Sequence, residues 1–433
     1  MPESSTSTND LRPGASSFRE YLFPPGHPRL QELQGQDARG HADRFLAESP
    51  VAEVVRGWTT SLEETSFDGI RADETIRQGL FELGDEGFDV AAVVAAADAL
   101  VASIDEAQRG ALLHPVDHYT WRAWMNPELY IHRFGLRLEE ISAPQVDAVF
   151  ALLKASLSSA GYEKVRALLR LNAFLGEVVD APGVLNELSY NINLFGQPSL
   201  TEPWGWNFYG HHVCINCVVV GTQVVMTPVF FGAEPNRIDT GPHAGADPFA
   251  VQERAGLGLV RSLSMEQARD AVLYKDKRDP QMPTGRLHPA DELHLAGAFQ
   301  DNRLIPYEGV CASALTQQQQ GQLVDLLASF LDYLPESSLQ ARLLACRAHL
   351  AETYFCWIGG TGDDDVFYYR VQSPVVLVEY DHHAGIFLAN DEPQKFHTHT
   401  VVRTPNGNDY GVEIRRLHDG MVTPPRLVDR SSL

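Results

Sequence analysis

The stretch FHTHTVVRTPNGNDYG, residues 396–411, decides the fold that we predict for this chain. His397 and His399 stand two residues apart in a run rich in Thr and Val, which favours a β-strand. Residues i and i+2 of a strand point to one face, so both imidazoles are expected to enter the same space. The Pro, Asn-Gly and Asn-Asp that follow predict a tight loop, with Arg403 and Asp409 near the same rim. Two convergent imidazoles indicate a metal site.

Strand-like runs lie on the N-terminal side of this stretch. ETYFCWIGG, DVFYYRVQS and VVLVEYD, between residues 352 and 381, are joined by Gly/Asp and Ser-Pro turns, which predicts an antiparallel meander. The run 205–235 predicts a hairpin around Gly221-Thr222. Residues from about 40 to 180 have a helical pattern. We therefore expect an α+β fold, in which a helical N-terminal half packs on a mainly antiparallel sheet built from a central hairpin and a C-terminal meander.

The chain contains no sharp linker, and we expect one domain. Residues 1–40 are expected to be a frayed N-terminal segment. Residues 41–433 are expected to form a single α+β metal-binding domain, with a helical part at 41–185 and a sheet-rich part at 186–420. A long loop at about 276–312 interrupts the second part, and loops of this length inside a domain are often functional.

Four helix starts are predicted from the capping-box spacing, in which Ser or Thr is followed three residues later by Glu or Gln. The pairs are Ser103 with Glu106, Ser142 with Gln145, Ser264 with Gln267, and Thr316 with Gln319. Their spacing along the sequence is irregular, which indicates four separate helix N-termini and not a solenoid repeat.

The composition excludes several classes of partner. The net charge of -23 argues against nucleic acid and against an anionic membrane, because both require basic patches. No apolar run is long enough to span a membrane, and the start of the chain does not resemble a signal peptide. Five cysteines are too few for a disulfide framework, so a reducing, cytoplasmic location is expected. Cys214 and Cys217 are three apart on a strand, and we expect them to face opposite sides as buried apolar residues.

Three clusters supply candidate metal ligands. Adjacent strand residues face opposite sides, so only one of His211 and His212 should reach the metal, and we favour His212. Glu379 and Asp381 share a face of an apolar strand, and an inward carboxylate needs a partner such as a cation. With His397 and His399, these residues suit Fe, Cu or Zn. The alternative is that the histidines hydrogen-bond within a polar core while the carboxylates pair with Arg370 and Arg403.

Other side chains are candidates for binding or positioning. Trp206 and Tyr209, just before the His pair, would form an aromatic wall, or they would simply pack in the core. Arg122, in an aromatic segment, and Arg303, in the long loop, are candidates for binding a substrate. Glu379, Asp381, Arg403 and Asp409 are candidate catalytic groups: a carboxylate as general base, Arg403 to hold a substrate carboxylate, and Asp409 to fix a histidine tautomer.

Several motifs together resemble the family called domain of unknown function 3500. They are PWGWNFYGHH, FFGAEP, QDNRLIPYEGV, FYYRVQSPVVLVEYDHH and FHTHTVVRTPNGNDYG, in that order, over roughly residues 115–415. The resemblance implies a common fold and one shared site that contains His211, His212, Glu379, Asp381, His397 and His399. It implies no particular reaction.

The sequence leaves three functions open. The first is a metal-dependent enzyme acting on a small organic molecule, with redox chemistry at non-haem iron or copper favoured, since mixed His/carboxylate ligation suits O₂ activation. The second is a zinc-type hydrolase or lyase that uses metal-activated water. The third is a non-catalytic protein that binds a small molecule. The expected partner is a small-molecule substrate, and a homodimer is one open arrangement.

Overall fold

The computed structural model describes residues 17–49, 52–420 and 427. Its centre is a 13-stranded sheet with the order β1-β3-β4-β5-β7-β13-β12-β11-β10-β8, to which β2, β6 and β9 add short edges. Most neighbours are antiparallel, while β1 with β3 and β10 with β8 are parallel. The strands are β1 (Leu113–His114), β2 (Leu136–Arg137), β3 (Tyr190–Phe195), β4 (Trp204–Gly210), β5 (Val213–Val220), β6 (Gln223–Val225), β7 (Val229–Ala233), β8 (Val272–Tyr274), β9 (Val310–Cys311), β10 (Tyr354–Gly359), β11 (Phe367–Gln372), β12 (Leu377–His382) and β13 (Thr398–Arg403).

The predicted α+β class is confirmed. The meander β10-β11-β12-β13 is antiparallel throughout, and β7 joins it to the central strands by pairing with both β13 and β5. The predicted hairpin around Gly221-Thr222 is the β5–β6 pair, whose Gly221 has a φ of +56°. Such a φ is costly for residues with a Cβ, so glycine suits this turn.

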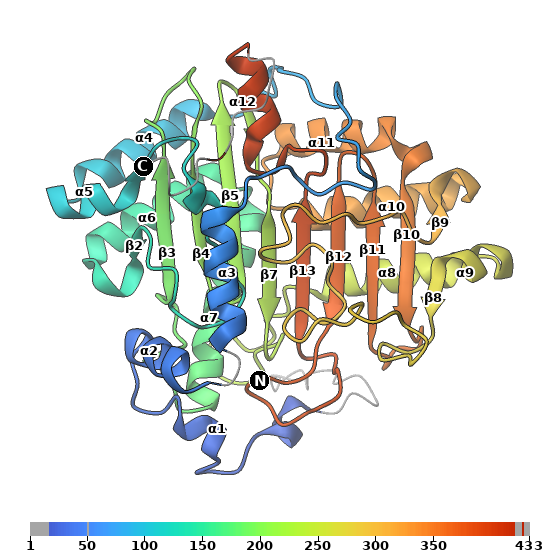
Figure 1. The fold of residues 1–433 in the computed structure, drawn as a ribbon, viewed down its shortest axis with the longest axis horizontal. Helices are drawn as coiled ribbons and strands as arrows, with labels where there is room; N and C mark the ends of the chain where they lie inside the picture. Colours follow the sequence, from blue (N-terminus) through green and yellow to red (C-terminus); the bar gives the residue numbers. More distant parts are fainter. Residues whose placement is uncertain (1–16, 50–51, 421–426, 428–433) are drawn as a thin grey trace, which may run out of the picture.

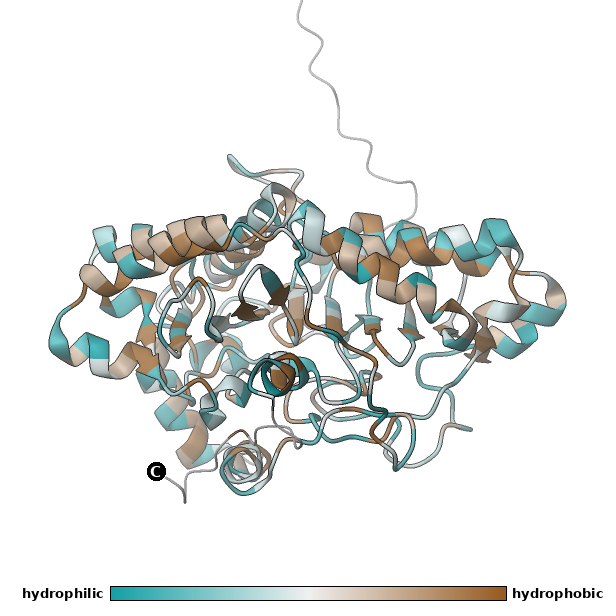
Figure 2. Cartoon of the chain, turned by 90° about the horizontal axis from the view of Figure 1, so that it is seen from above, coloured by the Kyte–Doolittle hydropathy of each residue, from teal (hydrophilic) through white to brown (hydrophobic). Residues whose placement is uncertain are grey.

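A layer of helices covers one face of the sheet, and two helices with long irregular segments cover the other (Figures 1 and 2). Helices from both halves of the chain form the first layer, and they share one large apolar cluster with the strands. The opposite face is covered by α3, α12 and long loops, which include residues 275–309. The helices are α1 (Pro28–Gln31), α2 (Ala38–Glu48), α3 (Ala52–Glu64), α4 (Val90–Ala102), α5 (Glu106–Leu112), α6 (Ala143–Ser156), α7 (Ser159–Val178), α8 (Ala250–Ser262), α9 (Met265–Ala271), α10 (Gln317–Phe330), α11 (Glu336–Ala348) and α12 (Val412–His418).

Three of the four predicted capping boxes are confirmed. Ser142, Ser264 and Thr316 cap α6, α9 and α10, and a Gln at the third helical position returns the hydrogen bond in each case. The fourth prediction is wrong, because α5 is capped by Asp105 with Gln108. Asp accepts the backbone N–H of the third helical residue as well as Ser does, so the helix starts two residues later than expected.

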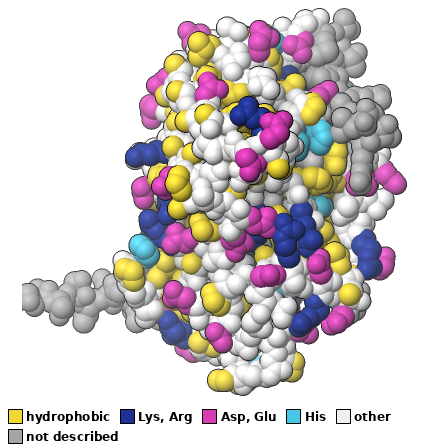
Figure 3. Space-filling view, turned by 90° about the vertical axis from the view of Figure 1, so that its left-hand side faces the viewer, with side chains coloured by type: hydrophobic (Ala, Val, Ile, Leu, Met, Phe, Trp, Pro, Cys, Tyr) yellow, Lys and Arg dark blue, Asp and Glu magenta, His cyan; other side chains and the backbone are white. Residues whose placement is uncertain are grey.

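Secondary structure begins within the N-terminal segment that we expected to fray. Residues 1–16 of that segment lie outside the described residues. Between residues 17 and 40, a 3₁₀ turn at Phe18–Tyr21 and helix α1 are present, and Phe18 and Leu30 are buried. Among the described residues, no helix is both long and apolar enough to cross a membrane. On the face shown in Figure 3, Lys and Arg are interspersed with Asp and Glu and form no continuous basic surface.

Candidate metal centre

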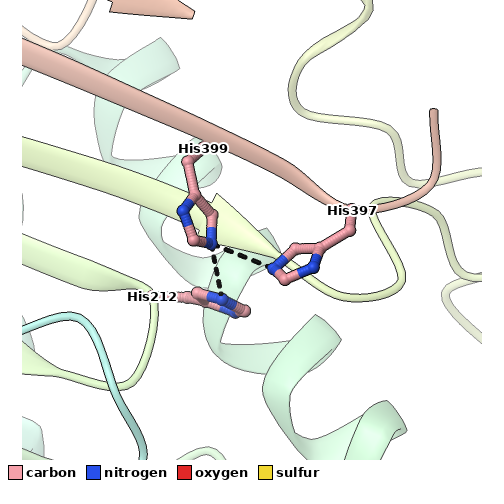
Figure 4. A group of neighbouring side chains, drawn as sticks. All are labelled: His212, His397 and His399. Carbon is pink, nitrogen blue, oxygen red and sulfur yellow. Dashed lines mark hydrogen bonds between the residues drawn. The ribbon is translucent and has the colours of Figure 1, made fainter. Parts of the chain in front are cut away.

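Three imidazoles from distant parts of the chain meet on the loop-covered face of the sheet (Figure 4). The Nε2 atom of His399 lies 3.0 Å from Nε2 of His397 and 3.1 Å from Nε2 of His212. All three side chains are buried. We call His212, His397 and His399 the first trio. Their ligand atoms lie close enough together to hold one metal ion.

The sequence explains how each ring is positioned. His399 points inward from the start of β13, and His397 directly precedes that strand, as the period of two predicts. His212 lies in the two-residue turn between β4 and β5, with a φ of +62°. A non-glycine residue in this region is strained, and such strain clusters at functional sites. His212 and His211 are therefore turn residues, and not the strand neighbours that we predicted.

The absence of a side chain at Gly232 makes room for the first trio. Gly232 pairs with His399 across β7 and β13, and its N–H donates to the His212 carbonyl over 2.8 Å. A Cβ at this position would lie 2.8 Å from Cδ2 of His399 and 2.9 Å from Cδ2 of His212. Both contacts are too short, so any larger residue would force the two rings away from their present positions.

The Nε2 atoms of the first trio cannot all be paired by hydrogen bonds. His397 Nδ1 lies 2.6 Å from the Ala384 carbonyl oxygen, which can only accept, so Nδ1 carries the proton and Nε2 presents a lone pair. A neutral ring nitrogen has either one proton or one lone pair. His399 Nε2 therefore cannot form a good hydrogen bond to His397 and to His212 at once. A cation would satisfy all three nitrogens together.

The distances fit a shared ion. Imidazoles bound to one metal at 2.0–2.1 Å have nitrogens about 2.9 to 3.4 Å apart for angles of about 90° to 110°, and ring centroids about 4.5 to 5.5 Å apart for angles up to about 120°. The centroid distances are 4.7 Å for His397–His399, 5.0 Å for His212–His399 and 5.5 Å for His212–His397. The trio is therefore close to the geometry of a metal centre.

A second group shares one ring with the first. His294, His383 and His399, which we call the second trio, also place ligand nitrogens close together, and all three are buried. Burial and neighbouring imidazoles hold the pKa of His212, His383 and His399 well below the usual value for histidine. These rings are therefore neutral at physiological pH, which is the form that binds metals.

The two predicted carboxylates lie beside the second trio, and they are held by other groups. Glu379 accepts the N–H groups of Leu295 and Ala296, each over 2.9 Å, and the Tyr368 hydroxyl over 2.6 Å. Its Oε2 lies 3.3 Å from His294 Nδ1. These groups hold the pKa of Glu379 at about 2, with the His294 hydrogen bond the largest stabilising contribution against burial. Glu379 supports a histidine here and is not grouped with the first trio.

Asp381 has a different set of partners. Its Oδ1 lies 2.7 Å from Lys277 Nζ, and its Oδ2 accepts the Leu293 N–H over 3.2 Å. His383 Nε2 also lies 3.2 Å from Oδ2. Burial raises the pKa of Asp381 to about 6, although Lys277 opposes the shift. The carboxylate is thus enclosed by a cation and a backbone donor.

Arg403 and Asp409, predicted near the histidines, lie in a separate buried network. Arg403 donates to Asp301 over 2.8 Å, to Asp409 over 3.2 Å and to the carbonyls of Ala296 and Gly297. Asp409 also accepts the Thr404 N–H over 2.7 Å. His399 is at the start of β13 and Arg403 at its end, about 13 Å along the strand. This distance explains why the network anchors the covering loop instead of joining the trio.

The predicted substrate residues are spread over the molecule. Trp206 faces the helical layer, where its Nε1 donates to Ser156. Arg122 is buried in an ion pair with Asp301 at 2.7 Å. Tyr209 is on the loop-covered face, where its hydroxyl donates to the His132 carbonyl. Arg303 is half-buried in the covering loop, near Glu379, which lies beside the second trio. None of these four contacts the first trio.

His211 lies beside the first trio without joining it. Its ring stacks on His212 with centroids 3.8 Å apart, and its Nδ1 lies 2.8 Å from the Asn172 oxygen. The prediction that only one of the pair reaches the cluster agrees with this geometry, but the reason is the turn and not strand alternation. Cys214 and Cys217 lie in different apolar clusters on opposite faces, as predicted, and all five cysteines are free.

Three residues at or beside the second trio were not predicted from the sequence. His294 and Lys277 come from the long loop, and His383 lies just beyond β12. None of them has a periodic relation to the other histidines. The only available signals were the unusual length of the loop and the His382-His383 pair that ends the strand.

The hollows near the trio are small. Two of about 20 Å³ lie on either side of the segment 125–127, whose Asn126 carbonyl accepts the His212 N–H over 3.2 Å. A larger, open depression of about 440 Å³ is lined by residues of α6 and α7, in the helical layer. His211, which lies beside the first trio, lines one of the two small hollows.

Comparison with known proteins identifies a family but no function. A family model described as a protein of unknown function, DUF3500, matches residues 86–412, more than half of the chain. Neither the search of curated proteins nor the search of solved structures returned a match. The matched region includes both trios and the whole sheet. The chain therefore belongs to the DUF3500 family.

Proposed function

We propose that the first trio holds a transition-metal ion and that the protein is a metal-dependent oxidoreductase acting on a small molecule. The observation that supports this most strongly is the approach of the His212 and His397 Nε2 atoms to within 3.1 Å of one nitrogen of His399. Protons alone do not pair three imidazole nitrogens that lie this close together, whereas a cation binds all three.

The donor set favours copper over iron within this proposal. Three imidazoles suit copper, zinc or iron, whereas many non-haem iron oxygenases use two histidines and a carboxylate. Glu379, the carboxylate that we expected to bind the metal, is occupied by Leu295, Ala296, Tyr368 and His294. This removes the mixed donor set that first suggested iron.

The surroundings of the trio suit a small redox reactant. Phe230 packs edge-on against His399 with centroids 5.1 Å apart, and the hollows nearby are about 20 Å³. A reactant of the size of O₂ or peroxide would require less movement of the covering loop than a large organic substrate. Exclusion of water also protects reactive intermediates.

A zinc-type hydrolase or lyase is the second candidate. The three-imidazole set is the one that catalytic zinc uses when a water fills the fourth position. Among the described residues, no fourth side chain is grouped with the first trio. A non-catalytic role, with the metal stabilising the fold, is supported by the burial of all three rings. Five free cysteines support a reducing, cytoplasmic location for each of these functions.

Metal analysis of protein purified without chelator tests the proposal. We expect one tightly bound copper ion, or iron, per chain in the wild type and none in the variant His397→Ala/His399→Ala. The matched control is His118→Ala, since His118 is buried and its Nδ1 bonds to Thr120, outside both trios. Stoichiometric zinc would replace the redox proposal by the hydrolytic one. A wild-type protein without metal, and a double variant of unchanged stability, would contradict the metal centre itself.

A further inference from the structure

We propose that the second trio is a second metal site, of lower affinity, and that His399 bridges the two ions. This inference rests on the proposed function, because the first ion occupies the first trio. Nothing in the family match assigns a metal to His294 or His383.

The two ring nitrogens of His399 face different trios, which is the orientation that a ring between two ions requires. Its Nε2 faces His397 and His212. Its Cδ2 faces β7, since a Cβ on Gly232 would lie 2.8 Å from it. Nδ1 is on the opposite side of the ring from Cδ2, so it faces β12, where Asp381 pairs with His399. His383 follows that strand directly, and its ring centroid is 3.9 Å from that of His399.

Each ring of the second trio retains an unsatisfied nitrogen. His294 Nε2, His383 Nε2 and His399 Nδ1 are buried, and none accepts or donates a hydrogen bond among the described residues. His383 Nε2 has one charged neighbour, Asp381 Oδ2 at 3.2 Å. All three residues are nearly inaccessible to solvent, at 2 to 3% exposed. Buried polar atoms without partners are uncommon and need a cause. A cation held by the three nitrogens supplies one cause for all of them.

Carboxylates orient this site as they do in known metal centres. Glu379 lies 3.3 Å from His294 Nδ1, which places a proton there and makes Nε2 the nitrogen that would bind an ion. Glu379, Asp381, Asp291 and Glu292 bring negative charge to the trio, and Lys277, Arg303, Arg286 and Arg370 lie among these carboxylates.

The second trio is less compact than the first. Its other centroid distances are 5.5 Å for His294–His383 and 6.1 Å for His294–His399, a wider spread than in the first trio. The rings must shift to share an ion, so the second ion should bind more weakly. When both sites fill, the bridging ring binds the second ion through the electron pair of its former N–H bond, and that proton is released to solvent.

Titration of metal-free protein with Co²⁺ alone tests the second site, with bound ion measured after gel filtration and by absorption. The wild type should bind two equivalents, the second at least tenfold more weakly. His294→Ala should bind one equivalent with the first affinity unchanged, and His118→Ala should still bind two. Saturation at one equivalent in the wild type would overturn the second site and leave the proposed function standing. No binding at all would overturn both.

A second variant tests the second trio without removing one of its rings. Glu379 touches His294 and not the first trio, so Glu379→Gln should weaken the second equivalent at least tenfold and leave the first within threefold. With Cu²⁺ as the probe, a filled pair should show magnetic coupling in electron paramagnetic resonance, which a merely structural role for His294 would not produce. Two uncoupled Cu²⁺ signals, or a second equivalent unaffected by either variant, would contradict the bridge.

Discussion

The Nε2 atoms of His399 and His212, which are 187 residues apart in the sequence, lie 3.1 Å from each other. One ring comes from the start of the last strand and the other from the turn between β4 and β5. Strand β7 lies between their two strands and has a glycine at the point of contact. The sheet order therefore creates the centre, since the two histidines meet only when β7 separates β5 from β13.

Gly232→Ala should remove the metal from the first trio. The added Cβ would lie under 3.0 Å from both His399 and His212, so at least one ring must move. We expect metal content below one-fifth of the wild-type value, measured by mass spectrometry, and a loss of stability of about 1–3 kcal/mol from the overpacked core.

Gly258→Ala is the matched control for this substitution. Gly258 lies in α8, where a Cβ would meet no atom within 4 Å. Alanine should raise helix stability by up to about 1 kcal/mol and leave the metal content unchanged. If Gly232→Ala retained a full complement of metal, the close packing of the two rings against β7 would not matter for binding.

Glu379→Gln should destabilise the fold by about 3 kcal/mol. The carboxylate accepts hydrogen bonds from two backbone N–H groups and from Tyr368. A buried donor that loses its charged acceptor raises the free energy of the folded state. An amide has only one oxygen to offer, so at least one donor is left without a partner. Urea unfolding measures the change, with Glu352→Gln as the exposed control, expected within 0.5 kcal/mol. Equal stabilities of the two variants would contradict this role.

The same carboxylate predicts a dependence of stability on pH. The folded-state pKa of Glu379 is about 2, below the ordinary value of 4.5. Its contribution is therefore complete above about pH 4.5 and disappears as the pH falls towards 2, a loss of about 3 kcal/mol. The difference in unfolding free energy between the wild type and Glu379→Gln should shrink over this interval. A difference that stays constant from pH 6 to pH 3 would show that the charge of Glu379 is not responsible.

Removal of metal should lower the thermal stability. An ion that binds only the folded state stabilises it by about 4 kcal/mol at a thousandfold excess over its dissociation constant. Chelator treatment should therefore lower the Tm by several degrees, and the metal alone should restore it. The variant His397→Ala/His399→Ala serves as the control and should respond to neither treatment. A Tm of the wild type that is insensitive to chelator would argue against occupancy of the site.

The parts of the centre that follow a strand period were predictable from the sequence. His397 and His399, and likewise Glu379 and Asp381, share a face because side chains alternate along a strand. The same rule separates Trp206, on the helical face, from Tyr209, on the loop-covered face, although both were expected in one wall. Alternation is a local property, so it gave the correct face for residues inside strands. It does not apply to His211 and His212, which lie in the turn between β4 and β5.

The remainder depends on contacts that no local pattern encodes. His294 reaches the centre from a loop without periodicity, and its partner Glu379 is 85 residues away. Asp409 was expected beside His397, but β13 carries the chain to the far end of the sheet before the turn, where Arg403 is the nearest charge. Gly232 gave no signal in the sequence, because it contributes by having no side chain. Two rings from distant parts of the chain fill the space that a side chain would occupy.

The most direct test of the central claim is an anomalous difference map from a crystal of the metal-loaded protein, collected at the absorption edge of the bound metal. The account predicts a peak about 2.0 to 2.1 Å from the Nε2 atoms of His212, His397 and His399. Strong anomalous density elsewhere, or a map without density between these three nitrogens at saturating metal, would contradict it.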